Sequence, residues 1–193
     1  MAAYLCNLRY CRNYELAKEK LTTQDKKEIL LFGTDDMGRT VWQLASKGGN
    51  LETILHIWEW AKEKLTTEEI NKLLLVTDNK GRTAWLWEAE RGRSRTFQKV
   101  WERAKQKLRK QELNKLLLST DENGKTAWHF AATSRNSETL RKVWLCAKEI
   151  QTTGELNKHL LHSNNRGKTA WHLAATSYNS ETLQKYGSVL KKI

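Results

Sequence analysis

The stretch DDMGRTVW at residues 35–42 returns three times along the chain, as DNKGRTAW (78–85), DENGKTAW (121–128) and NNRGKTAW (164–171). The glycines of the four copies are spaced by 43 residues, and so are their tryptophans. A fixed period of this length is typical of repeat proteins, in which each unit packs against its neighbours. We therefore treat the four copies as markers of one repeated structural unit.

The repeat extends over the chain as a single domain, residues 1–193. Proline is absent and glycine accounts for only 10 of the 193 residues, so no Pro/Gly-rich linker separates two parts. The first segment joins the series with a one-residue slip, because its KLTT (20–23) matches KLTT at 64–67. The predicted units are the partial unit 1–34, the full units 35–77, 78–120 and 121–163, and the partial unit 164–193.

Each full unit is predicted to contain three helices, as the first one illustrates. Thr40 can cap a short helix, which Gly49-Asn50 interrupts. A second helix over about 51–64 places apolar residues at i, i+3, i+4 and i+7 from Ile54, which makes one apolar stripe. The sequence TTEE (66–69) supplies a capping box for a third short helix. No segment alternates at period two for long, so we expect an all-α fold with little or no sheet.

The stretches 121–132 and 164–175 resemble the ankyrin repeat signature, in which Thr-Pro-Leu-His-Leu-Ala-Ala opens the inner helix. Ala127 and Ala170 stand where that family has proline, and a tryptophan follows each where the family has leucine. The likeness weakens in the second full unit, where Glu88 replaces a small alanine. Ankyrin units are usually about 33 residues long. The extra residues here are assigned to a longer second helix and an added third one.

The resemblance implies a helical solenoid in which neighbouring units bury one another's apolar stripes. His129 and His172 occupy the family's histidine position, where the resemblance implies a hydrogen bond that ties neighbouring turns together. A period of 43 also falls in the armadillo and HEAT range of about 40–47 residues. That alternative ranks second, because those families lack the Asp-x-x-Gly-x-Thr turn before the inner helix.

The chain contains nine tryptophans. Those that recur at the repeat spacing, in the columns that begin with Trp42 and Trp58, are assigned to the core, because each buried indole removes about 150–250 Å² from water. Trp60 and Trp87 stand outside these columns. We predict that these two make exposed contacts.

The resemblance also implies a non-catalytic interaction scaffold that binds a partner protein through the concave face of the array. It assigns a binding surface, because ankyrin arrays bind partner proteins with their turn tips and inner-helix faces. These are the places where the copies differ most, as a solvent-facing surface permits. One position in the turn stays cationic throughout and predicts a basic ladder made of Arg39, Arg82, Lys125 and Lys168. The assigned residues are Asp36, Met37, Arg39, Lys47, Asn79, Lys80, Arg82, Glu90, Arg91, Glu122, Asn123, Lys125, Thr133, Asn165, Arg166, Lys168 and Thr176.

The net charge of +12 is uneven, since residues 78–120 alone carry 12 basic and 5 acidic side chains. This excess predicts a partner protein with an acidic surface. The alternative is an array that binds nucleic acid or an anionic membrane through residues 91–110, where basic clusters lie at both ends of the second helix. The interrupted units at both ends also leave open a head-to-tail self-association.

No catalytic, cofactor or metal motif accompanies the repeat. The GKT at 124–126 lacks the leading glycine of a phosphate-binding P-loop, because Ser119 stands there. The histidines have no cysteine or carboxylate at ligand spacing. We therefore predict a protein that is not an enzyme and has no cofactor, metal or small-molecule substrate.

The compartment is predicted from what the sequence lacks. We see no signal peptide and no apolar run long enough to cross a bilayer. The odd number of cysteines, Cys6, Cys11 and Cys146, does not suggest a disulfide framework. The expected location is cytoplasmic or nuclear.

Overall fold

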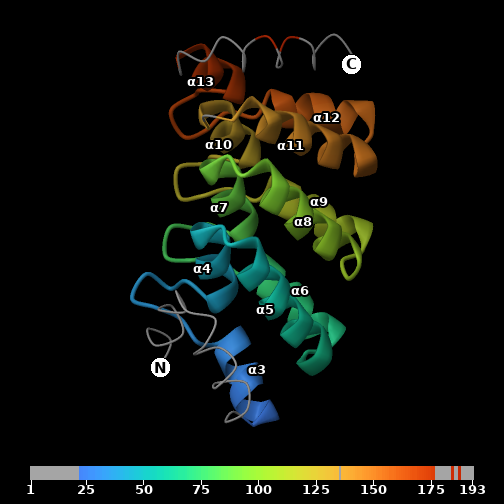
Figure 1. The fold of residues 1–193 in the computed structure, drawn as a ribbon. Coiled ribbons are helices and arrows are strands. Elements are labelled where there is room, and N and C mark those ends of the chain that lie inside the picture. Colours follow the sequence, from blue (N-terminus) through green and yellow to red (C-terminus); the bar gives the residue numbers. More distant parts are fainter. Residues whose placement is uncertain (1–21, 135, 177–183, 185–186, 188–193) are drawn as a thin grey trace.

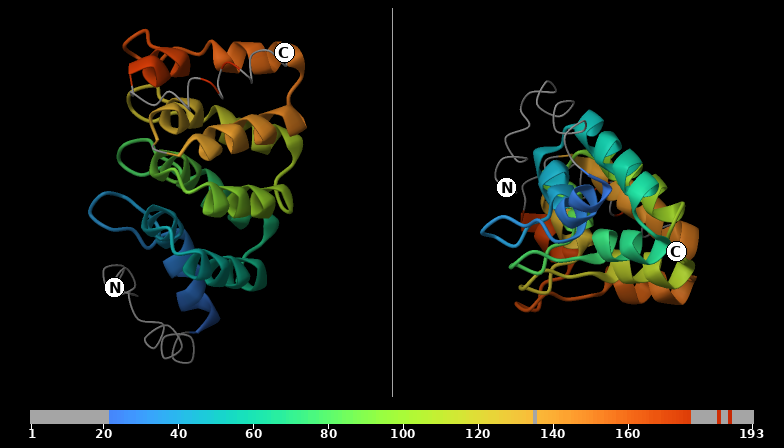
Figure 2. Two further views of the ribbon diagram at one scale, coloured as in Figure 1. Left: turned by 45° about the horizontal axis from the view of Figure 1, so that its top comes forward. Right: turned by 90° about the horizontal axis from the view of Figure 1, so that it is seen from below.

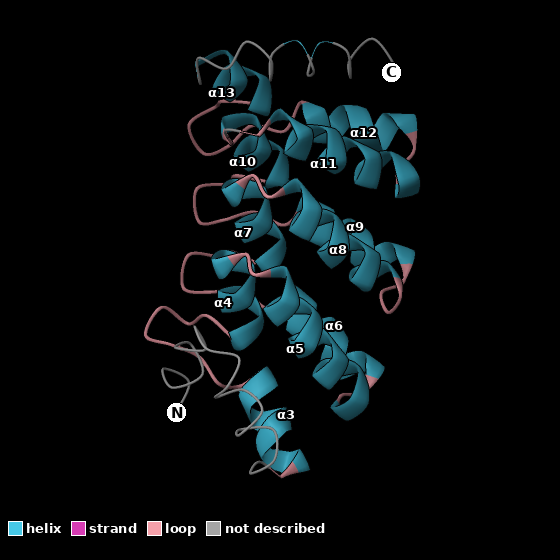
Figure 3. Cartoon of the chain, viewed as in Figure 1, coloured by secondary structure: helices cyan, strands magenta, loops and turns pink. Residues whose placement is uncertain are grey.

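The computed structural model describes residues 22–134 and 136–176, together with residues 184 and 187. These residues form eleven helices and no strand (Figure 3). The extended backbone among them pairs only in two isolated bridges, Thr34 with Thr40 and Ser163 with Thr169. The prediction of an all-α fold with little or no sheet is confirmed for this part of the chain.

Every full unit contains three helices, as predicted, and one further helix lies on each side of the three units. The bounds are α3 (Thr23–Leu31), α4 (Val41–Gly48), α5 (Leu51–Lys64), α6 (Thr67–Leu75), α7 (Ala84–Arg91), α8 (Ser94–Lys105), α9 (Lys110–Leu118), α10 (Ala127–Thr133), α11 (Ser137–Ile150), α12 (Thr153–Leu160) and α13 (Ala170–Thr176).

Local sequence sets the helix ends. Thr40 and Thr66 begin α4 and α6 with side-chain caps, and in both cases the N3 side chain reaches back to the backbone of the threonine. Asn50 caps α5 through its side chain, and Gly49 ends α4 with a left-handed φ of 70°. These caps satisfy backbone groups that the helices leave unpaired. The predicted start and stop signals of the first unit are therefore confirmed.

Corresponding helices of successive units lie side by side. The first helices form one row, in which α4 contacts α7, α7 contacts α10, and α10 contacts α13 (Figure 1). The longer second helices flank this row, and α8 contacts α11. The connections that lead into the first helices gather on one side of the molecule, away from the second and third helices (Figure 2).

The core consists of the recurring tryptophans and the apolar stripes of the helices. Trp42, Trp85 and Trp128 are fully buried in α4, α7 and α10. Each lies beside a buried tryptophan of the second helix of its unit, with ring centroids 5.9, 5.3 and 6.3 Å apart in the three units. The assignment of both columns to the core is confirmed in the full units.

Trp171, the fourth member of the first column, differs from its prediction. Its side chain is 39% exposed. Among the described helices, α13 contacts α10, whereas α10 lies between α7 and α13. Within this part of the chain, the fully buried indole is therefore the one whose helix has a neighbour on each side.

The prediction that Trp60 and Trp87 make exposed contacts was wrong, since both are only 7% exposed. The ammonium group of Lys26, from α3, lies 5.9 Å from the Trp60 ring centroid. The indole N–H of Trp87 donates a hydrogen bond to Asp78 at 3.0 Å. Charged side chains from neighbouring elements thus lie against these rings, and a search for recurring tryptophans alone does not detect this.

Cys6 and Cys11 lie outside the described residues. Cys146 is a free thiol buried in α11, and burial raises its pKa well above the ordinary range. None of the described helices is both long and apolar enough to cross a membrane.

Candidate partner-binding surface

Each unit begins with a turn that is organised by one acidic or amide side chain. In the second unit, Asp78 Oδ1 accepts hydrogen bonds from the backbone N–H groups of Lys80 and Arg82, both at 2.9 Å. Asp35, Asp121 and Asn164 make the same pair of bonds in their own turns. A side chain that accepts from the backbone two and four residues ahead fixes the turn locally.

Successive turns are also joined to one another through their backbones. The N–H of Asn79 donates to the carbonyl of Met37, that of Glu122 to Lys80, and that of Asn165 to Asn123, each at 2.9 Å. The four turns therefore form one continuous strip, with a hydrogen bond at every step.

Close stacking requires glycine at the inner corner of the turn. Gly81 has a φ of 71°, in the left-handed region that other residues rarely adopt. A Cβ atom at Gly81 would lie 3.1 Å from the backbone nitrogen of Glu122 in the next turn. The glycine column thus serves both the turn and the approach of its neighbour.

Two of the first helices, α4 and α10, are fastened to the following turn by the side chain at their N3 position. In α4, Gln43 Nε2 donates to the carbonyls of Val76 at 2.9 Å and Arg82 at 2.8 Å. In α10, His129 Nε2 lies 3.0 Å from the carbonyl of Lys168. The hydrogen bond between turns that the resemblance implied is therefore present at His129. His172 Nδ1 contacts Thr169 within its own turn.

The basic ladder is present as a row of positions, but its charge is unevenly neutralised. Arg39 pairs with Asp35, with Nε 2.8 Å from the carboxylate. Arg82 pairs with Glu90 at 2.9 Å and lies 3.9 Å from Asp121. Lys125 and Lys168 form no ion pair with any described residue. The free positive charge of the ladder thus lies in its second half.

Two aromatic residues stand beside the ladder. The guanidinium carbon of Arg82 lies 4.7 Å from the ring centroid of Trp87 and 5.1 Å from that of Phe130. Lys47 and Lys125 also approach these rings, at 5.2 and 5.7 Å. Burial is the largest cause that lowers the pKa of Lys47, and the nearby charges of Arg39 and Arg91 add to it. These cation–π contacts hold three basic side chains in place.

Sequence analysis did not assign Trp87 or Phe130 to this surface. A signal was available, because they occupy one column of the first helices with Leu44 and Leu173, and in the two central units the column becomes aromatic. The buried state of both rings separates them from the exposed turn tips.

Most of the other assigned residues are exposed. Thr133 lies at the end of its helix, and its hydroxyl donates to the carbonyls of His129 and Phe130. Glu90, Lys47, Arg39, Arg82 and Lys125 are partly covered. The exposed members of the set are Asp36, Met37, Asn79, Lys80, Arg91, Glu122, Asn123, Thr133, Asn165, Arg166, Lys168 and Thr176.

The two basic clusters of residues 91–110 lie at opposite ends of α8, as predicted. Several of their members have partners within the chain. Arg93 donates to the carbonyl of Lys47 at 3.1 Å, Lys105 pairs with Glu149, and Arg109 pairs with Glu112 at 2.7 Å. The two ion pairs reduce the charge available to an anionic ligand, and the bond to Lys47 occupies a donor of Arg93.

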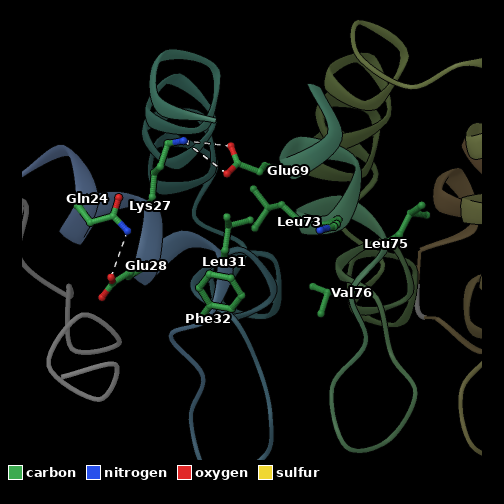
Figure 4. Close-up of a pocket in the computed structure, with 10 residues that line it drawn as sticks. Gln24, Lys27, Glu28, Leu31, Phe32, Glu69, Leu73, Leu75 and Val76 are labelled. Carbon is green, nitrogen blue, oxygen red and sulfur yellow. Dashed lines mark hydrogen bonds and ion pairs between the residues drawn. The ribbon is translucent and has the colours of Figure 1, made fainter. Parts of the chain in front are cut away.

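A groove that the sequence did not predict lies between α3 and α6 (Figure 4). It encloses about 600 Å³, and its lining includes Leu31, Leu73 and Val76. An ion pair between Lys27 and Glu69, at 3.3 Å, closes one side. Phe32 at the edge of this groove is 76% exposed.

The most deeply buried carboxyl group among the described residues lies in α7. Glu88 in α7 has no exposed area, and its Oε2 accepts a hydrogen bond from the Thr96 hydroxyl at 2.5 Å. Burial raises the pKa of Glu88 to about 7, although Thr96 and the charge of Arg93 act in the opposite direction. The residue that departs from the ankyrin-like alanine is thus a carboxyl group within the stack.

No group of three His, Cys, Asp or Glu side chains within the described ranges is arranged to hold a metal ion. A comparison with known protein families and a search of curated protein sequences each found no match to this chain.

Proposed function

We propose that this chain is a non-catalytic protein-interaction scaffold, built as an ankyrin-like helical repeat solenoid. It binds an acidic surface of a partner protein through the strip of turns and the adjoining face of the first helices. The single observation that carries the proposal is the backbone bonding between successive turns. The carbonyls of Met37, Lys80 and Asn123 accept from the backbone of the next turn, so the strip has a backbone frame. The tip side chains of Asn79 and Asn165 add bonds to the carbonyls of Asp36 and Glu122.

The side chains at the turn tips vary from unit to unit. The position after the first turn residue holds Asp36, Asn79, Glu122 and Asn165, and the next holds Met37, Lys80, Asn123 and Arg166. Such variation on a rigid frame lets different positions of one surface bind different groups of a partner. Because the backbone is already ordered, little conformational entropy is lost on binding.

The aromatic pair supports a protein as the partner. Arginine and aromatic residues are enriched at the energetically important centres of protein interfaces. Arg82, held between Trp87 and Phe130, combines both at the middle of the strip. Arg82 is paired with Glu90, so the cation offered to an acidic partner side chain is Lys125, which lies 5.7 Å from the same Phe130 ring.

The alternative is binding of nucleic acid or an anionic membrane through residues 91–110. It is less well supported, because Arg93, Lys105 and Arg109 have partners within the chain. The remaining cations are divided between the two ends of α8. This alternative predicts an affinity that falls steeply with added salt, which titration of DNA, RNA and acidic vesicles would measure.

The proposal is tested by capture of partner proteins with two double variants of equal charge change. Lys80→Glu with Arg91→Glu alters exposed positions at a turn tip and at the end of α7. Lys115→Glu with Lys148→Glu is the control and alters exposed positions on α9 and α11. We expect the first variant to lose at least about tenfold in partner recovery, and the control to match wild type.

The helical circular dichroism of both variants should match that of the wild-type chain. Equal recovery by the two variants would contradict the proposal, since the turn surface would then contribute nothing specific.

A further inference from the structure

A small cavity lies between the third and fourth turns. It encloses about 230 Å³ and is lined by Asn123, Lys125, Asn164, Arg166, Lys168 and Leu173. Pockets for drug-sized ligands span about 300–1,000 Å³, whereas one water molecule needs about 10–15 Å³. The cavity therefore suits a single side chain or a small ion better than an extended molecule.

The lining of this cavity contains three cations and no carboxylate. Lys125, Arg166 and Lys168 form no ion pair with a described residue, unlike Arg39 and Arg82 in the earlier turns. Three like charges around a small volume repel one another unless an anion joins them. The electrostatics of the cavity therefore favour a ligand with more than one negative charge.

Asn164 strengthens the preference for an anion, because its side chain is an uncharged amide. Its Oδ1 accepts from the backbone N–H groups of Arg166 and Lys168, both at 3.0 Å, as the equivalent aspartates do in their turns. The second terminal atom is therefore an amide nitrogen. In the other turns this position holds a carboxylate oxygen, which accepts from Arg39 in the case of Asp35 and from Trp87 in the case of Asp78.

The change from aspartate to asparagine thus keeps the turn and removes one negative charge. It replaces an acceptor by an N–H donor at a position beside three cations. The same turn geometry is built four times, and only the fourth copy lacks the carboxylate.

We propose that this cavity binds a phosphoryl group on a phosphorylated side chain of the partner protein. The inference rests on the proposed function and adds the chemical class of one recognised residue. A phosphoserine or phosphothreonine carries about −1.5 to −2 charges at pH 7 and three acceptor oxygens. Lys125, Arg166 and Lys168 supply the charge, and the Asn164 amide supplies a neutral donor. A carboxylate would offer half the charge and two oxygens.

The full chain, labelled with ¹⁵N, is titrated with N-acetyl-phosphoserine amide, with inorganic phosphate, and with N-acetyl-serine amide at matched ionic strength. We expect saturable shifts of the amides of residues 123–125 and 164–168 with both phosphate probes and none with the serine compound. Larger amide shifts with the phosphoserine compound than with inorganic phosphate would support a phosphorylated side chain as the ligand. Shifts with inorganic phosphate alone would overturn the proposal.

Asn164→Asp restores the carboxylate present in the other three turns, so the fold should tolerate it. We expect this variant to bind the phosphoserine compound at least about tenfold more weakly, because a like charge is placed beside the ligand. Asn50→Asp is the matched control, since it makes the same change at the cap of α5, where aspartate caps as well as asparagine. Equal affinities of Asn164→Asp and wild type would overturn the site.

The failure of this site is distinguishable from that of the proposed function. Partner capture that survives phosphatase treatment and Asn164→Asp, but is lost with Lys80→Glu and Arg91→Glu, would overturn the phosphoryl site alone. The opposite result is phosphoserine binding that depends on Asn164, together with partner capture that is unchanged by Lys80→Glu and Arg91→Glu. It would contradict the proposal that partner proteins bind the whole strip of turns.

Discussion

The third and fourth copies of the motif are nearly identical in sequence, yet they differ in burial and in charge. Trp128 is fully buried and Trp171 is 39% exposed. His129 is buried and contacts the next turn, whereas His172 is exposed and contacts its own. The motif supplies the local turn and helix, and the neighbouring unit supplies the burial. In a stack of this kind, stability belongs to the contacts between units as much as to the units themselves.

The largest effect on stability should be the difference between alanine substitutions of Trp128 and of Trp171. Trp128→Ala removes a fully buried indole from between α7 and α13, and we expect a loss of about 3–5 kcal/mol in unfolding free energy. Trp171→Ala removes a side chain that is already partly in water, so its loss should be clearly smaller. Urea unfolding followed by circular dichroism measures both, and equal losses would mean that the neighbours do not determine burial.

The sequence predicted the repeat, the three helices per unit and the buried tryptophan columns, because those features depend on spacing within one unit. It did not predict the exposure of Trp171 or the burial of Trp60 and Trp87, because these depend on which side chains of other elements lie across them. Of the binding surface, the row of cations could be predicted from position alone. Its neutralisation by Asp35 and Glu90 could not, since ion pairs depend on side-chain geometry.

The next effect concerns a histidine that packs on the buried tryptophan of the third unit. His159 in α12 lies edge-on to Trp128, with ring centroids 5.9 Å apart. Burial is the largest cause that lowers the pKa of His159 from 6.5 to about 4. The folded state therefore disfavours the charged ring, and stability should fall as the pH drops from about 6.5 towards 4.

In full, this loss is on the order of 3 kcal/mol. His159→Gln should remove that part of the pH dependence, as measured by unfolding at several pH values. His56→Gln, at an exposed position of α5, is the control and should leave the profile unchanged. If His159→Gln lost as much unfolding free energy as wild type between about pH 6.5 and 4, the assignment of this loss to His159 would be contradicted.

Glu88 also differs from its counterparts, because the equivalent position is alanine in the other three copies, at Ala45, Ala131 and Ala174. Its folded pKa of about 7 exceeds the ordinary 4.5. Stability should therefore be lost as the pH rises from about 4.5 to 7, opposite in sign to the effect of His159. The two slopes oppose each other between about pH 4.5 and 6.5, so in that range the slope of either group becomes steeper when the other is removed.

Glu88→Gln should raise the unfolding free energy above pH 7 relative to wild type, by at most about 3 kcal/mol. Glu68→Gln, on the exposed side of α6, should have little effect on the same measurement. A Glu88→Gln variant that is less stable than wild type at pH 8 would show that the ionised carboxylate is compensated.

The smallest effect should come from making the third turn resemble the fourth. Asp121→Asn keeps the Oδ1 acceptor that binds the N–H groups of Asn123 and Lys125, as Asn164 does in its own turn. We expect a loss below about 1 kcal/mol in unfolding free energy, since the interactions removed are the 3.9 Å contact with Arg82 and a long hydrogen bond of 3.4 Å from the Asn123 side chain. A loss of several kcal/mol would mean that the carboxylate charge is needed for the turn.

The central claim is that partner proteins bind the strip of turns, and lysine footprinting on the complex tests it most directly. Acetylation followed by mass spectrometry compares the reactivity of each lysine in the free and bound chain. The account predicts that Lys80, Lys125 and Lys168 lose reactivity on binding, while Lys115 and Lys148 on α9 and α11 keep theirs. Protection of Lys115 and Lys148, with the three turn lysines unchanged, would contradict it.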